Sequence, residues 1–94
     1  MDLAVKGFQW DPAKNLANLE KHGIDFEDAK QIFYGPIAVS QSHHPDEPRW
    51  IAIGELQARL IAVVFTYRDG DIRIISARRA RKNEERAYRD TKMG

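Results

Sequence analysis

Arginine and lysine side chains are concentrated at the C-terminal end of this chain, where they could bind phosphate groups. Residues 68–94 hold nine Lys or Arg and five Asp or Glu, a net charge of +4, whereas residues 1–67 hold six and nine, a net charge of −3. Because a guanidinium group is permanently charged and can donate to two oxygens at once, Arg78 and Arg79 are the first candidates for such contacts. A basic end of this kind is typical of a protein that meets phosphates.

The composition limits the other kinds of chemistry. The 94 residues fit a single domain, residues 1–94, in which we expect residues 1–7 to form a flexible leader. With no cysteine, a disulfide scaffold and a thiolate metal site are both excluded. The sequence has no Gly-rich phosphate loop, no nucleophile triad and no zinc pattern, so we expect neither metal nor cofactor. No N-terminal apolar run suits a signal peptide or a membrane span, so we expect a cytoplasmic protein without membrane contact.

The first helix is predicted from its two ends. Asp11, followed by a proline, is a typical helix start, and Gly23 can take the left-handed conformation that ends a helix. Leu16 and Leu19 lie three residues apart, so we expect both side chains to face the core. A short strand is predicted just before this helix, at residues 8–10.

A second helix, four strands and a final helix follow. Asp25 is the predicted N-cap of the second helix, which ends before Gly35. We expect strands at residues 37–39, 49–54, 59–67 and 72–77, a hairpin turn at Asp69-Gly70, and a final helix whose inner face carries Ala80, Glu84, Ala87 and Tyr88. Short links between successive strands favour an antiparallel meander packed on one face by helices, an α+β fold of two layers.

Several linked segments resemble the BrnT family of toxins in sequence and in order. They are residues 8–12 (FQWDP), 18–24 (NLEKHGI), 25–29 (DFEDA), 49–54 (RWIAIG) and 73–80 (RIISARRA). The resemblance implies a RelE-like α+β fold: an antiparallel sheet packed by two N-terminal helices, plus a C-terminal helix. It also implies a toxin of a type II toxin–antitoxin module, an endoribonuclease that cleaves RNA and blocks translation. The implied partner is a BrnA-like antitoxin, with the toxin alone a monomer and the complex a heterotetramer around a dimeric antitoxin.

Metal-independent cleavage of RNA requires charge stabilisation on the phosphate and proton transfer at the ribose 2′-OH and the leaving oxygen. For charge stabilisation we predict Arg78 and Arg79, although both could instead be solvated and paired with Glu84 or its neighbour. Glu47 is a candidate general base, or a rim carboxylate that holds Arg49 or Arg59. Tyr67 could orient a base or pass a proton, or could be a half-buried aromatic residue.

Five further residues are predicted to bind substrate: Arg49, Arg68, Arg73, Lys21 and His22. Arg73 alternates with apolar neighbours, which is equally typical of the solvent side of a strand. His22 is equally explained as the last residue of a helix, where its charge suits the helix dipole. Trp10 and Trp50 could stack on bases, but their apolar-alternating segments favour the core.

One position departs from the family pattern. The family often has Thr at the place of Arg81, three residues before Glu84, and Thr-x-x-Glu is a capping box. Because an Arg side chain cannot accept from the helix amides, we expect that cap to be lost, at a cost of about 1 kcal/mol.

Two other functions stay open. The basic end also suits a non-catalytic nucleic-acid-binding module, or an inactive toxin homologue that acts only as the antitoxin's partner in a repressor complex.

Overall fold

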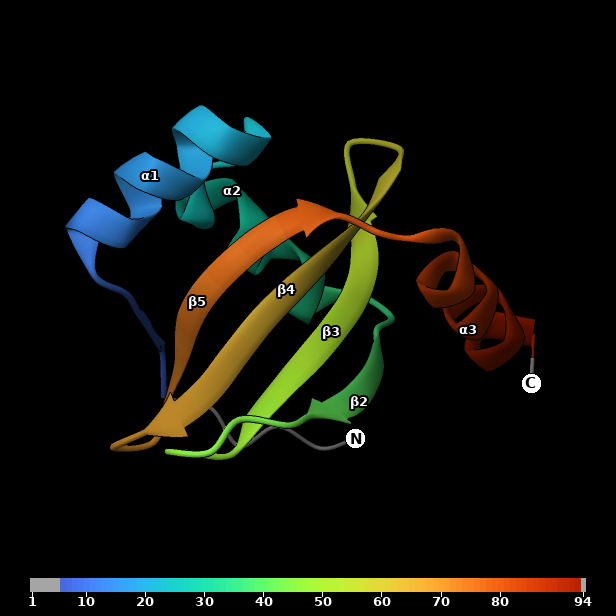
Figure 1. Ribbon diagram of the computed structural model, residues 1–94. Helices are drawn as coiled ribbons and strands as arrows, with labels where there is room; N and C mark the ends of the chain where they lie inside the picture. The colour runs from blue at the N-terminus through green and yellow to red at the C-terminus, as the bar shows by residue number, and fades with distance from the viewer. Residues whose placement is uncertain (1–5, 94) are drawn as a thin grey trace.

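A five-stranded β-sheet organises residues 6–93, the part of the chain that the computed structural model describes (Figure 1). The strands are β1 (Phe8–Gln9), β2 (Ala38–Ser42), β3 (Arg49–Leu56), β4 (Arg59–Arg68) and β5 (Asp71–Arg79), in the order β1-β5-β4-β3-β2. Strands β2 to β5 form the predicted antiparallel meander. Strand β1, for which the sequence predicts no partner, pairs parallel with β5, so the sheet as a whole is mixed rather than purely antiparallel. No tight turn joins β1 to β5, so nothing local to either strand fixes their relative direction.

The start of the described chain lies beside the β4–β5 hairpin. Both turn residues have positive φ angles, 56° at Asp69 and 85° at Gly70, as the expected Asp-Gly hairpin requires. The N–H of Lys6 donates to the carbonyl of Gly70 at 3.0 Å, and the N–H of Ile72 donates to the carbonyl of Gly7 at 3.0 Å. The last two residues of the predicted leader are therefore held by the sheet, while residues 1–5 lie outside the described part.

Helix α1 (Pro12–His22) packs on β5 through a polar side chain. Asn18 is only 7% exposed, and its amide both donates to the carbonyl of Ala77, at 2.9 Å, and accepts from the N–H of Ala77, at 3.1 Å. Leu16 and Leu19 are 63% and 39% exposed, so the prediction that they face the core is wrong. Because β1 pairs with only the start of β5, the rest of that strand edge needs another partner, and Asn18 supplies it.

The predicted second helix is in fact two short helices. Helix α2 (Phe26–Ala29) gives way to a 3-10 helix, η1 (Lys30–Tyr34), and Asp25 caps α2 by accepting from the N–H of Glu27 at 3.0 Å. Tight packing under η1 explains a glycine inside β3. A Cβ at Gly54 would lie 2.7 Å from the Cβ of Ile32, so only glycine lets the two backbones approach this closely.

The main core lies between the sheet and α2 with η1. Its buried members are Phe26, Ala29, Ile32, Ala52, Ile61, Val63, Phe65, Ile72, Ile74 and Ala77. Trp10 and Trp50 pack against this cluster, and the ring centroids of Trp50 and Phe65 are 6.0 Å apart. The preference for core packing over base stacking is therefore confirmed for both tryptophans.

Helix α3 (Lys82–Met93) lies on the other face of the sheet, over β2 and β3 (Figure 1). Tyr88 is 5% exposed and packs with Ala38, Ile53 and Ala62, as its place on the predicted apolar stripe indicates. In the described part of the chain, α3 leaves the part of this face near the β4–β5 hairpin uncovered (Figure 1). Among the described residues, no helix is long and apolar enough to cross a membrane.

Candidate nucleic-acid interface

A β-bulge in β5 places two distant arginines on the same face of the sheet. Ile75 is an extra residue of β5, inserted between the residues that pair with Val64 and Phe65. The β4 partners of Arg73 and Arg78 are four residues apart, so the two arginine side chains point to the same side. Without the extra residue, their five-residue spacing would put them on opposite faces.

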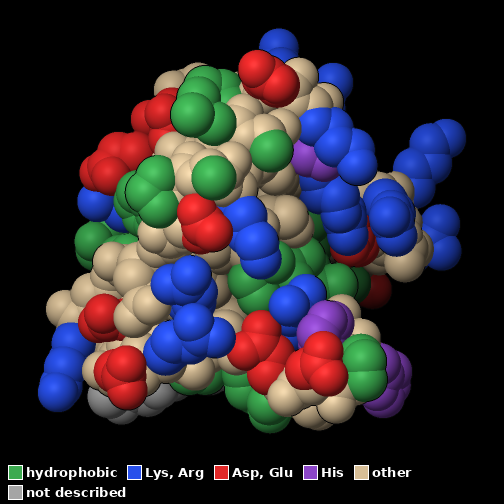
Figure 2. Space-filling view, turned by 60° about the vertical axis from the view of Figure 1, so that its left-hand side comes forward, with side chains coloured by type: hydrophobic (Ala, Val, Ile, Leu, Met, Phe, Trp, Pro, Cys, Tyr) green, Lys and Arg blue, Asp and Glu red, His purple; other side chains and the backbone are tan. Residues whose placement is uncertain are grey.

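The helices α1, α2 and η1 do not cover this side of the sheet, and we call it the open sheet face. It carries four arginines, with Glu47 at its margin: Arg49, Arg68, Arg73 and Arg78. At roughly 3.3 Å per residue, Arg73 and Arg78 are about 13 Å apart along the sheet. Figure 2 looks obliquely onto this face, and blue Lys and Arg side chains gather across it with red acidic side chains between them. An extended polyanion could contact several of these guanidinium groups at once.

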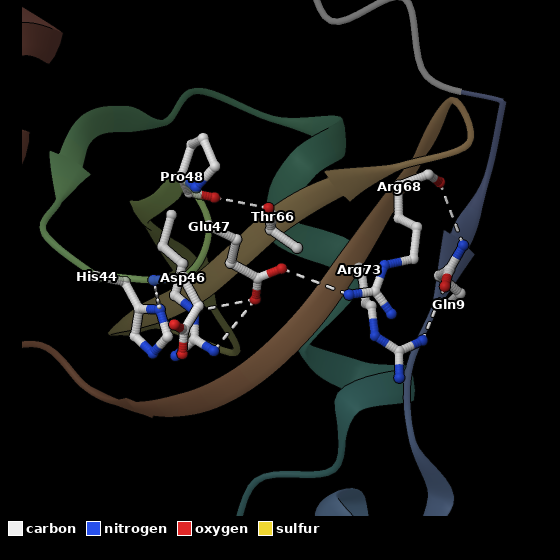
Figure 3. Close-up of polar contacts among 9 residues, drawn as sticks. Gln9, His44, Asp46, Glu47, Pro48, Thr66, Arg68 and Arg73 are labelled. Carbon is white, nitrogen blue, oxygen red and sulfur yellow. Dashed lines mark hydrogen bonds and ion pairs between the residues drawn. The ribbon is translucent and has the colours of Figure 1, made fainter.

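Glu47 is held between two arginines at the start of β3 (Figure 3). Its Oε1 accepts from Nε and Nη2 of Arg49 at 3.2 and 3.1 Å, and its Oε2 lies 3.4 Å from Nη2 of Arg68. The Thr66 hydroxyl donates to the carbonyl of Pro48 at 2.6 Å and so fixes the loop that carries Glu47.

Charge at this cluster decides the protonation of Glu47. Desolvation raises its pKa, but the hydrogen bond from Arg49 and the charges of Arg49 and Arg68 together outweigh this effect, so the pKa lies below its ordinary value. Glu47 is therefore a carboxylate at neutral pH. Its side chain is 27% exposed, so a ligand on the open sheet face can reach it.

Arg73 is oriented by a side chain from the other end of the chain (Figure 3). The Oε1 of Gln9 accepts from Nη1 of Arg73 at 2.7 Å, while its Nε2 donates to Oδ2 of Asp71 at 3.2 Å and to the carbonyl of Arg68 at 3.3 Å. Sequence reasoning missed Gln9. Only the parallel pairing of β1 with β5, which puts Gln9 opposite Arg73, would have identified it.

Arg78 is paired with Glu84 rather than open to a ligand. Its Nη1 and Nη2 donate to the two carboxylate oxygens of Glu84 at 2.7 and 2.9 Å, and the side chains are 18% and 12% exposed. Glu84 is the partner that the alternative interpretation of Arg78 named, although the Arg78 side chain is largely buried rather than solvated. The hydrogen bond from Arg78 lowers the pKa of Glu84, and the same bond raises the pKa of Arg78.

Glu84 also preserves half of the capping box. It accepts from the backbone N–H of Arg81 at 2.8 Å, so the N-terminus of α3 has a side-chain cap even though Arg81 itself offers no acceptor. The expected loss of the cap is therefore only partial. Together, the bonds of Glu84 to Arg78 and Arg81 attach α3 to the end of β5.

The nine predicted site residues separate into a group of five and four others. The open sheet face carries five of them: Glu47, Arg49, Arg68, Arg73 and Arg78. Arg79 pairs with Ile61 and so points to the opposite, helix-covered face, where it lines a cavity with His22. Lys21 is exposed in the last turn of α1. The predicted catalytic set is thus spread over both faces.

Tyr67 belongs to the helix-covered face as well. Its ring lies 5.2 Å from Trp50 and 5.7 Å from Phe65, and it is 40% exposed. Burial raises the pKa of its hydroxyl above the ordinary value. Tyr67 therefore matches its alternative reading, a half-buried aromatic residue, and it lies across the sheet from Glu47.

His44, in the loop between β2 and β3, accepts one local hydrogen bond. Nδ1 of His44 accepts from the N–H of Asp46 at 3.3 Å (Figure 3). Within residues 6–93, no three His, Asp or Glu side chains are grouped as a metal site would need.

A small α+β domain with a basic, partly uncovered sheet face is suited to binding a phosphate backbone. Residues 10–84 match the family described as the ribonuclease toxin BrnT of type II toxin–antitoxin systems, and the chain belongs to that family. The crystal structure of the Brucella abortus ribonuclease toxin BrnT is similar, with 30% sequence identity and a TM-score of 0.63; the match covers 81% of this chain and 97% of that one. No curated protein matches the chain. The family match confirms the resemblance seen in the sequence. Membership of the family implies an RNA target and an antitoxin partner.

Proposed function

We propose that this toxin cleaves RNA on the open sheet face, without a metal ion, by attack of a ribose 2′-OH on the adjacent phosphorus. The observation that carries the proposal is the cluster of Glu47, Arg49 and Arg68 beside the Gln9-held Arg73. It places a carboxylate that is ionised at neutral pH among guanidinium groups that can bind phosphate oxygens. Family membership supplies the ribonuclease class.

Each group has a role that its geometry allows. Glu47 takes the proton of the 2′-OH, and a new bond forms between the 2′-oxygen and phosphorus. Arg68 and Arg73 hold the oxygens on which negative charge increases. The bond from phosphorus to the 5′-oxygen breaks, and that oxygen leaves with a proton from solvent. The products are a 2′,3′-cyclic phosphate and a 5′-hydroxyl end.

Arg78 has a different role in this proposal. Because both of its terminal nitrogens are bonded to Glu84, it anchors α3 beside the open sheet face rather than binding phosphate. Arg79, on the other side of the sheet, is not part of the cleavage site.

The test is an RNA cleavage assay in excess EDTA with purified protein. Wild type should cut RNA and leave cyclic-phosphate ends. R73A should lose about 10²–10³-fold in rate, as expected when a charge-stabilising donor is removed, and E47Q about 10²–10⁴-fold, as expected when a general base is removed. R86A is the matched control, because Arg86 is exposed on α3 and has no ion pair among the described residues. Cleavage that EDTA abolishes would contradict metal independence, and full activity of R73A would move the site elsewhere.

One observation favours a second function. Glu47 is already engaged by two arginines, which also suits a surface that binds RNA without cutting it. RNA binding with no cleavage under any condition would support this non-catalytic module or the inactive homologue.

The finer biological assignments are proposals too. They are a block of translation, a BrnA-like antitoxin, a heterotetrameric complex with it and a cytoplasmic location. Expression without an antitoxin should arrest bacterial growth, and co-expression of a cognate antitoxin should restore it.

A further inference from the structure

A second basic site lies on the helix-covered face, at the β3–β4 hairpin. A cavity of about 140 Å³ opens between the C-terminal end of α1, the helix α2 and the hairpin. We call it the hairpin pocket; its lining includes His22, Ile24, Asp28, Leu56, Arg59 and Arg79. It is far below the ~300–1,000 Å³ of a drug-sized site, so it admits one small or flat group.

Two guanidinium groups line this pocket, and neither is paired within the described part of the chain. Arg79 pairs across the sheet with Ile61, and Arg59 is two residues before Ile61 on β4, so both point to the same face as neighbours. Both are exposed, and neither side chain has a hydrogen bond or ion pair with any residue between 6 and 93. In contrast, the arginines at positions 49, 68, 73 and 78 of the open sheet face all have partners.

The backbone at the pocket rim is strained. Gln57 and Ala58 form the two-residue turn of the hairpin with φ angles of 51° and 65°, a left-handed conformation that normally selects Asn or Gly. Gln57 itself lines the pocket. Strain of this kind, held by the surrounding structure, is concentrated at ligand sites.

The remaining lining indicates what kind of group fits. Ile24 and Leu56, both partly exposed, offer apolar surface to a flat ring, while the carboxylate of Asp28 can only accept hydrogen bonds. Of the four RNA bases, guanine alone presents two adjacent N–H donors on its Watson–Crick edge, which match both oxygens of one carboxylate. The same carboxylate would repel a free phosphate but not a base whose phosphate lies at the two arginines.

We propose that the hairpin pocket binds one guanine nucleotide of the RNA, with its base against Asp28 and its phosphate on Arg59 and Arg79. The proposal rests on RNA being the substrate, as proposed above, and adds a preference for guanine that the open sheet face does not supply. His22, also in the lining, is a further donor to the bound nucleotide.

Binding of single nucleotides tests this without any cleavage. The whole protein is titrated with GMP, AMP and inorganic phosphate, and binding is followed by amide NMR shifts. GMP should shift the amide signals of Gly23, Asp28 and Ala58. One bidentate base contact predicts that GMP binds about tenfold more tightly than AMP. D28N should remove that preference while keeping nucleotide binding, and R59A should weaken both nucleotides. R86A, the exposed control, should change neither.

Three results would overturn the proposal: equal affinities for GMP and AMP, phosphate binding as tightly as GMP, or shifts that avoid the hairpin. Cleavage of RNA that contains only uridine separates the two proposals. If that RNA is cut while GMP does not bind, only the guanine pocket is wrong. If GMP binds at the hairpin but no RNA is cut, only the cleavage mechanism is wrong.

Discussion

Replacement of Asn18 by Leu should destabilise the fold more than its single polar side chain suggests. The amide of Asn18 makes three hydrogen bonds: it donates to the carbonyls of Ala77 and Ile24 at 2.9 and 3.0 Å and accepts from the N–H of Ala77 at 3.1 Å. Leu would leave these three backbone groups without their partner. With about 1–3 kcal/mol for each buried group left unpaired, the three groups cost about 3–9 kcal/mol; less the ~1–2 kcal/mol that a buried Leu gains, the net loss is about 1–8 kcal/mol.

Urea and thermal unfolding, followed by circular dichroism, measure this loss. Because each kcal/mol shifts the unfolding midpoint of a domain of this size by about 4–8 °C, N18L should unfold at least about 4 °C below wild type. N83L makes the same change at an exposed position on α3 and should shift the midpoint far less. Hydrogen exchange at the Ala77 amide should accelerate in N18L alone. If N18L were as stable as N83L, Asn18 would not be the partner that completes the edge of β5.

Two further changes test the strained turn and the α3 anchor. A58G should raise the free energy of unfolding by roughly 0.5–1 kcal/mol. The strain energy of an alanine in the left-handed conformation slightly exceeds the cost of the added chain entropy of glycine. A lower unfolding midpoint in urea would show that the turn is unstrained. E84Q should cost about 1–3 kcal/mol at neutral pH, since a neutral amide replaces the carboxylate that Arg78 binds. The pKa of Glu84 is lowered in the fold, so its contribution is present above the ordinary carboxyl pKa and is lost as pH falls through the folded pKa. The gap in stability between wild type and E84Q should therefore close in acid, and a gap that is constant with pH would contradict the ion pair.

Features fixed by local chemistry were predictable from the sequence. The Asp11 and Asp25 caps, the Gly23 stop and the Asp69-Gly70 turn all depend on residues close together in the chain, and each is present. The strands of the meander were also found, because apolar runs between turn residues indicate them.

Features that depend on distant residues were not predictable. The parallel pairing of β1 joins Gln9 to Arg73 across the whole fold. Helix α1 packs on the sheet through the buried Asn18. The apolar spacing of Leu16 and Leu19 therefore predicted the wrong inner face for this helix.

The candidate site was predicted by residue type better than by geometry. The spacing of Arg73 and Arg78 assigns them to opposite faces unless the bulge at Ile75 is known, and no residue near Ile75 indicates a bulge. Similarly, the pairing of Arg78 with Glu84 was one of several open alternatives. The position at which α3 begins decides which carboxylate lies beside Arg78.

The central claim is that the open sheet face holds the RNA strand that is cut. The most direct measurement is NMR of the protein with a 2′-O-methyl oligouridine, which cannot be cleaved and contains no guanine. Shifts should appear at the Arg49, Arg68 and Arg73 side-chain N–H groups and should be absent at Arg79 across the sheet. Shifts confined to Arg79 and α1, with the open sheet face unchanged, would contradict the claim.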